Sequence, residues 1–95
     1  MARYELVNPA DDRRGASRPL APRLRSLAGA RVALLDNRKG NANVLLRRIG
    51  ESLTREYGVA ALPWEEKRIY SRPAADEQIE RLVAESDAVV AAIGD

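Results

Sequence analysis

The pattern of hydrophobic and polar positions predicts alternating strands and helices after residue 31. Residues 32–35 form a continuous apolar run between Gly29 and the pair Asp36-Asn37, which is typical of a strand buried on both faces of a parallel sheet. The next apolar residues recur at helical spacing and predict a helix over residues 41–57, with Gly58 as a left-handed C-terminal cap. The stripe of this helix comprises Ala42, Leu45, Leu46, Ile49, Leu53 and Tyr57.

The second half of the chain repeats this alternation in shorter segments. Residues 67–70 predict a short strand, with Pro63 and Trp64 in the connection before it. Pro73 suits the first turn of a second helix. The negative charges of Asp76 and Glu77 are favourable at the positive, N-terminal end of that helix. Residues 88–93 predict a third strand without alternation. The buried stripe expected for the second helix comprises Ala75, Ile79, Leu82, Val83 and Ser86.

The order strand, helix, strand, helix, strand predicts an α/β fold with an open three-layer parallel sheet. Right-handed crossovers would place the first strand in the centre and one helix on each face. We expect residues 31–95 to form half of a doubly wound domain, and residues 1–30 to form an extended N-terminal arm. Leu20, Leu24 and Leu27 predict a short helical turn at the end of this arm.

Length and composition exclude several classes of protein. With 95 residues and a mass of 10.5 kDa, the chain is expected to form one small domain. It contains no cysteine and no histidine, so it cannot itself supply a disulfide framework, a thiol nucleophile, a zinc site of Cys and His ligands or a His-based triad. No apolar run reaches the ~18 residues of a membrane span, and residues 1–14 have no signal-peptide core. We therefore expect a cytoplasmic protein that does not bind membranes.

The charge pattern does not favour nucleic-acid binding. The chain has sixteen Lys and Arg residues and fourteen Asp and Glu residues, for a net charge of +2. Residues 1–31 are richer in arginine, with seven arginines against three acids, but no recognition motif and few aromatic residues accompany them. The arm is better explained as a solvated segment or one that a partner covers.

Candidate binding residues follow the first and third predicted strands. In open parallel sheets, ligands bind beyond the carboxyl ends of the strands. The free N–H groups of the first helix, with Lys39, would hold a carboxylate or phosphate that Asn37 or Asn41 orients. Alternatively, Asn41 is an ordinary helix N-cap and residues 37–40 an ordinary turn. Asp36 is either an acid facing the substrate or a cap on the loop.

The end of the third strand contributes Gly94 and Asp95 to the same predicted site. Gly94 would let the backbone turn sharply, and Asp95 would orient the next residue, act as a base or cap a following helix. Residues 36–41 contain one glycine and match neither a dinucleotide-binding fingerprint nor a P-loop. No cofactor and no metal ion are expected, and the predicted ligand is a small molecule.

Several segments resemble the amino-terminal part of the UGSC family of selenoproteins and their cysteine homologues. They are YELVNPA (4–10), LAPRL (20–24), RVALLDNRKGNANVLLRRIGESL (31–53) and DAVVAAIGD (87–95). Family members continue after the Gly-Asp pair with selenocysteine or cysteine and then Gly-Ser-Cys. The resemblance implies a selenol- or thiol-dependent enzyme that performs redox or selenol- or thiol-based catalysis. Its reactive residue would lie directly after Asp95, outside this chain.

The resemblance leaves two expectations for the source of the reactive residue. One is a reading frame closed at an unrecognised selenocysteine codon, so that the chain is an N-terminal fragment. The other is a split small subunit whose partner carries Gly-Ser-Cys. In either case no catalytic residue is expected within this chain. A non-catalytic subunit that pairs edge to edge with another α/β protein, and only shapes its site, is the alternative.

Overall fold

The computed structural model describes residues 19–69 and 71–94 of the chain. Its elements follow the order β1 (Val32–Asp36), α1 (Ala42–Tyr57), β2 (Trp64–Glu66), α2 (Asp76–Glu85) and β3 (Ala88–Ala92). The predicted α/β alternation is therefore confirmed. Residues 1–18 of the predicted arm, and Tyr70 and Asp95, lie outside the described residues.

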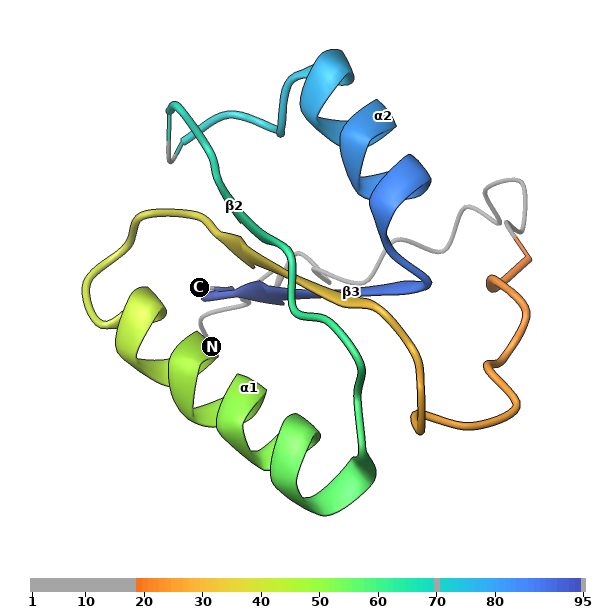
Figure 1. Cartoon of the computed structure of the whole chain (residues 1–95). Helices are drawn as coiled ribbons and strands as arrows, with labels where there is room; N and C mark the ends of the chain where they lie inside the picture. The colour runs from red at the N-terminus through yellow and green to blue at the C-terminus, as the bar shows by residue number, and fades with distance from the viewer. Residues whose placement is uncertain (1–18, 70, 95) are drawn as a thin grey trace, which may run out of the picture.

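The strands form a parallel sheet in the order β2-β1-β3, with β1 in the centre as predicted. Leu34 lies opposite Trp64 on β2 and opposite Val90 on β3, so the central residue of β1 pairs on both sides. Helix α1 covers one face of the sheet and α2 lies on the other, which gives three layers (Figure 1). This arrangement places the carboxyl ends of all three strands at the same end of the sheet, which we call the carboxyl edge.

The hydrophobic core lies between the sheet and α1. One cluster joins Leu34 of β1 and Ala92 of β3 to Ala42 and Leu46 of α1, and the side chain of Leu46 is fully buried. A second cluster surrounds Val32 at the other end of the strand; its buried members are Ala30, Val32 and Val59. The burial of apolar surface against β1 is thus what holds α1 and the sheet together.

Helix α1 confirms the predicted boundaries almost to the residue. It ends at Gly58, whose backbone is left-handed (φ 70°) and whose N–H donates to the Leu53 carbonyl, as a glycine cap requires. Within the predicted stripe, Ala42 and Leu46 are buried, whereas Leu45 and Tyr57 are exposed. The buried face is therefore narrower than the stripe, because α1 packs over β1 and β3 and leaves its flank free.

The second strand lies earlier in the chain than predicted. It spans Trp64–Glu66, and the prediction of a strand at residues 67–70 is wrong. Backbone pairing with β1 sets this position: Leu34 donates to the Pro63 carbonyl oxygen at 2.7 Å, and Lys67 donates to that of Asp36 at 2.9 Å. Since β1 ends at Asp36, β1 offers no further strand pairing to the chain after Lys67. Proline is tolerated before this edge strand, because the Pro63 carbonyl oxygen accepts a hydrogen bond from Leu34 and no N–H donor is needed at this position.

Helix α2 begins later and faces differently than predicted. It starts at Asp76 rather than near Pro73, and its buried residues are Gln78 and Leu82. The prediction that Ile79 and Val83 are buried is wrong: their relative exposures are 45% and 74%. Polar contacts decide this orientation. Gln78 Nε2 donates to the Glu66 carbonyl oxygen at 2.7 Å and to Glu65 Oε2 at 3.1 Å, which turns the Gln78 face toward β2.

The predicted helical turn over Leu20, Leu24 and Leu27 is not present. Leu20 and Leu24 are exposed, and only Leu27 packs against the core around Val32. Proline in the middle of this stretch, Pro22, lacks the N–H that a helix needs. The segment instead reaches β1 through a turn in which Ala30 donates to the Leu27 carbonyl oxygen at 3.0 Å.

Candidate functional site

The carboxyl edge of the sheet gathers the loops in which the candidate residues lie. The β1–α1 loop, the β2–α2 loop and the end of β3 meet on one side of the molecule (Figure 1). Lys67 bonds its N–H to the carbonyl oxygen of Asp36, and Asn37 bonds its N–H to that of Ala92 at 3.0 Å. The loop that follows the central strand β1 therefore lies between the ends of β2 and β3.

Asn37 fastens the β1–α1 loop to the end of β3. Its Nδ2 donates to the Ile93 carbonyl oxygen at 2.6 Å, and its Oδ1 accepts the Lys39 N–H at 3.3 Å. Together with its own N–H bond to Ala92, three hydrogen bonds converge on this one residue. Asn37 thus holds the predicted binding loop beside the residues that precede Gly94.

Asp36 is buried, with 5% relative exposure, at the last position of β1. Its Oδ1 accepts the Arg38 N–H at 2.7 Å, so the carboxylate caps the loop, which is one of the two roles that the sequence left open. Contact of Asp36 with a substrate stays a prediction. Lys39 lies half-buried in the same loop, and its carbonyl oxygen accepts the Ala42 N–H at 3.1 Å.

Asn41 occupies the N-cap position of α1 but does not cap the helix with its side chain. Its backbone is left-handed, with φ 68° and ψ 2°, a conformation that asparagine tolerates better than most residues. The helix start is partly satisfied from within: Ala42 donates to the Lys39 carbonyl, Val44 to Asn43 Oδ1 and Leu45 to the Asn41 carbonyl. The N–H groups of Ala42 and Val44 therefore have partners in the chain, and the binding of an anion at this helix start stays a prediction.

Gly94 follows β3 at this edge, but its surroundings do not require a glycine. A Cβ at this position would meet no heavy atom within 4 Å, and its φ lies outside the left-handed region. The expectation that Gly94 makes a sharp turn possible has no support in its backbone. Asp95 lies outside the described residues, so its predicted role stays a prediction.

Arg38 is the residue of this loop that the sequence did not single out. Its Nη1 donates to the Arg68 carbonyl oxygen at 2.9 Å and ties the β1–α1 loop to the β2–α2 loop. Its backbone is left-handed (φ 67°), which is uncommon for a residue with a long side chain. No local sequence signal indicates either feature. Two left-handed non-glycine residues in one short loop, Arg38 and Asn41, mark a strained segment of the kind often found at binding sites.

The lowered carboxyl pKa values of the described residues lie away from the β1–α1 loop. Hydrogen bonding to Arg81 lowers the pKa of Glu65, with a further contribution from Gln78. Hydrogen bonding to Arg31, through both its side chain and its backbone, lowers the pKa of Asp87. The first pair joins β2 to α2, and the second joins the amino ends of β1 and β3. Both therefore stabilise the scaffold.

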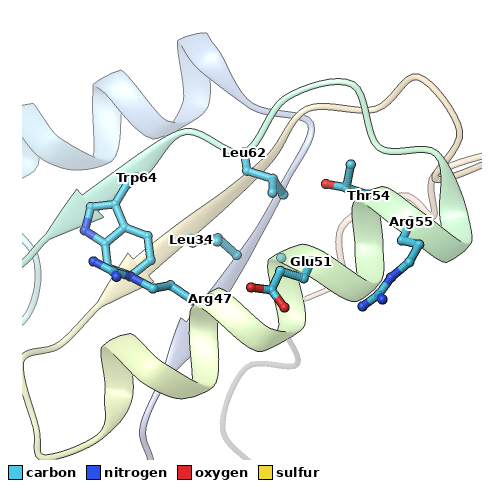
Figure 2. A pocket seen from close by; sticks show the side chains of 8 residues that line it. Leu34, Arg47, Glu51, Thr54, Arg55, Leu62 and Trp64 are labelled. Carbon is cyan, nitrogen blue, oxygen red and sulfur yellow. The ribbon is translucent and has the colours of Figure 1, made fainter.

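A cleft formed by described residues of α1, β1 and β2 is separate from the carboxyl edge. It has a volume of about 650 Å³ and lies between α1 and the α1-facing side of β2. Trp64 and Leu62 reach into it from one side, and Arg47, Glu51, Thr54 and Arg55 from the helix, with Leu34 in its floor (Figure 2). None of the predicted site residues that the structure describes lines this cleft.

Within residues 19–69 and 71–94, no group of His, Cys, Asp and Glu side chains is placed to hold a metal ion. None of the helices in this part of the chain is long and apolar enough to cross a membrane.

No curated protein and no solved structure matches the chain. The model of the UGSC family, in contrast, matches residues 5–95, which is essentially the whole length and includes both the β1–α1 loop and the end of β3. The chain therefore belongs to the UGSC family.

Proposed function

We propose that this chain supplies the substrate-binding edge of a selenol- or thiol-dependent catalytic unit, in the cytoplasm, whose reactive residue directly follows Asp95 or arrives on a separate subunit. The observation that carries the proposal is the attachment of the β1–α1 loop to the end of β3 by Asn37. A residue that follows β3 would emerge next to this loop.

The composition of the loops favours an anionic group at this edge. Arg38 and Lys39 follow β1, and Lys67 and Arg68 follow β2. Positive charges near a selenol or thiol lower its pKa and favour the reactive anion. The same charges would attract a small anionic substrate.

Thiol reactivity of a reconstituted unit tests this proposal. The 95-residue chain is mixed with the C-terminal half of a UGSC-family cysteine homologue, beginning at its Cys-Gly-Ser-Cys motif. The alkylation rate of the first motif cysteine is then measured against pH, with the second motif cysteine replaced by serine. We expect the chain to lower the apparent pKa of the first motif cysteine by about one pH unit or more from the usual thiol value of about 8.5.

Two variants sharpen this test. Lys39→Ala should reduce the shift, whereas Arg48→Ala, on an exposed position of α1, should leave it unchanged. A profile that the chain does not alter, although the two polypeptides bind, would overturn the catalytic proposal. That outcome would instead favour a non-catalytic subunit that completes the partner's sheet, a role that suits the open edge of β3.

A further inference from the structure

The two edges of the sheet differ in how they are protected. The β2 edge carries Glu65 and Glu66, follows Pro63, and has the Glu66 carbonyl oxygen capped by Gln78. Charges and proline are the usual means by which edge strands avoid pairing with other chains. The β3 edge (AVVAA) has neither charge nor proline. The β3 edge is thus open to pairing, whereas the β2 edge is not.

The unpaired groups of β3 can be assigned from its pairing with β1. Ala88 donates its N–H to the Arg31 carbonyl oxygen at 3.3 Å, and the Ala92 carbonyl oxygen accepts from Asn37. In a parallel strand, backbone groups alternate between the two neighbours. The N–H and C=O groups of Val89 and Ala91 therefore point to the outer edge, where none of the described residues forms a further strand.

The two faces of β3 are also unequal. Its α1 face is covered, since Ala92 is buried and Val90 packs against the core. On the α2 face, Val89 is 45% exposed, and Ile79 and Val83 of α2 are exposed beside it. These residues line a hollow of about 350 Å³ between α2 and β3. We define the docking face as the outer edge of β3 together with Ile79, Val83 and Val89.

We propose that the docking face binds a polypeptide that adds a strand parallel to β3 and packs an apolar helix along α2. The right-handed crossover rule supports this occupant. A helix that follows β3 and leads to a parallel strand on its outer side must lie on the α2 face. On this face Val89 of β3 and Ile79 and Val83 of α2 are exposed, while the opposite face of β3 is already covered by α1.

A second copy of this chain fits the docking face less well. In a symmetric dimer, the β3 strands of the two copies would pair antiparallel. The two-fold axis would then lie about 2.4 Å outside β3, which is half of the ~4.8 Å spacing between neighbouring strands. Helix α2 crosses from β2 to β3 over β1, and Gln78 and Arg81 hold it toward β2. The two α2 helices would then lie at least about 14 Å apart, wider than the 8–10 Å of packed helices.

A helix centred between β3 and a new parallel strand would, by the same spacing, lie about 7–10 Å from α2 along the sheet. It would therefore contact Ile79 and Val83 directly. The inference rests on the proposed function only for the identity of the partner, a UGSC-type polypeptide that carries the reactive residue. The location of the interface follows from the β3 edge and the exposed residues beside it.

The test measures binding of the C-terminal half of a UGSC-family cysteine homologue to the 95-residue chain by isothermal titration calorimetry. Val83→Lys should weaken binding at least tenfold, because it places a charge in the docking face. Val44→Lys is the matched control, since Val44 is an exposed valine on α1, outside this face, with 52% relative exposure. Circular dichroism should show both variants folded.

Hydrogen exchange provides a second measurement. The N–H groups of Val89 and Ala91 should exchange rapidly in the isolated chain and become protected on binding. Equal affinities for Val83→Lys and Val44→Lys, or unprotected Val89 and Ala91 in the complex, would overturn the inference. So would a homodimer that Val83→Lys alone dissociates, with no binding of the C-terminal half. A complex with the expected interface but an unaltered thiol would refute only the proposed function.

Discussion

Asn37 offers the most direct test of how the candidate site is assembled. Replacing it with alanine leaves its backbone bond to Ala92 intact but removes the Nδ2 donor of the Ile93 carbonyl and the Oδ1 acceptor of the Lys39 N–H. The first of these bonds, at 2.6 Å, is short and partly buried, whereas the second, at 3.3 Å, is long. Most of the expected loss therefore comes from the Ile93 contact.

The structure sets the size of this loss. A net hydrogen bond contributes about 0.5–1.5 kcal/mol, and a polar group left without a partner costs about 1–3 kcal/mol when buried. Because the Asn37 site is only partly buried, we expect Asn37→Ala to lower the free energy of unfolding by about 1–2 kcal/mol. For a domain of this size, each kcal/mol lowers the Tm by roughly 4–8 °C.

Asn37→Asp separates the hydrogen bond from the shape of the side chain. At neutral pH the variant places a carboxylate oxygen against the Ile93 carbonyl oxygen, so it should be less stable than Asn37→Ala. Protonation restores a donor, which raises the pKa of the introduced carboxyl in the folded state. The deficit relative to the wild type should therefore shrink as the pH falls.

Urea unfolding followed by fluorescence measures these changes. Trp64 is the single tryptophan and lies on β2, so its emission reports disruption of the sheet. Asn43→Ala is the control, because Asn43 is exposed and its contact is local, to the Val44 N–H. The reasoning would be refuted if Asn37→Ala and Asn43→Ala gave the same free energy of unfolding, or if Asn37→Asp were as stable as the wild type at neutral pH.

Three further predictions concern the scaffold. Leu46→Ala should lower the free energy of unfolding by about 2–5 kcal/mol because Leu46 is fully buried, whereas Leu45→Ala, at an exposed neighbour, should cost clearly less; equal losses in urea unfolding would contradict the orientation of α1. Arg38→Gly should be more stable than Arg38→Ala by about 1 kcal/mol, since glycine adopts the left-handed backbone without strain, and the reverse order in thermal melts would argue against that backbone. Hydrogen bonding to Arg31 lowers the pKa of Asp87. The contribution of this carboxylate to the free energy of unfolding is therefore present above the unfolded pKa of about 3.9, and it is lost as the pH falls through the lower folded value. Asp87→Asn should flatten the loss of stability at acid pH, and an unchanged acid profile would count against the ion pair.

Local patterns were sufficient to predict the elements that form the core. The continuous apolar run of β1, the helical spacing of α1 and the glycine at Gly58 each act over a few residues, and the structure confirms them. The central place of β1 also follows from the strand order and the rule of right-handed crossovers. Family membership, likewise, was evident from the residues around the β1–α1 loop and the end of β3.

Only the tertiary structure decided the position of β2 and the orientation of α2. β2 is short and has weak preferences of its own, so its location depends on which residues find backbone partners on β1. The orientation of α2 depends on Gln78 reaching the Glu66 carbonyl, a contact between residues on different elements. Apolar spacing alone favoured Ile79 and Val83 for burial, and it does not reveal that no described element covers them.

The candidate site shows the same division. Its residue types and its place at the carboxyl edge could be predicted, because parallel strands end on one side of a sheet. The contacts of Asn37 with Ile93 and of Arg38 with Arg68 could not, since they join residues 56 and 30 positions apart. Short-range preferences along the chain decide which elements form, whereas hydrogen bonds between distant segments exist only once the sheet has brought the loops together.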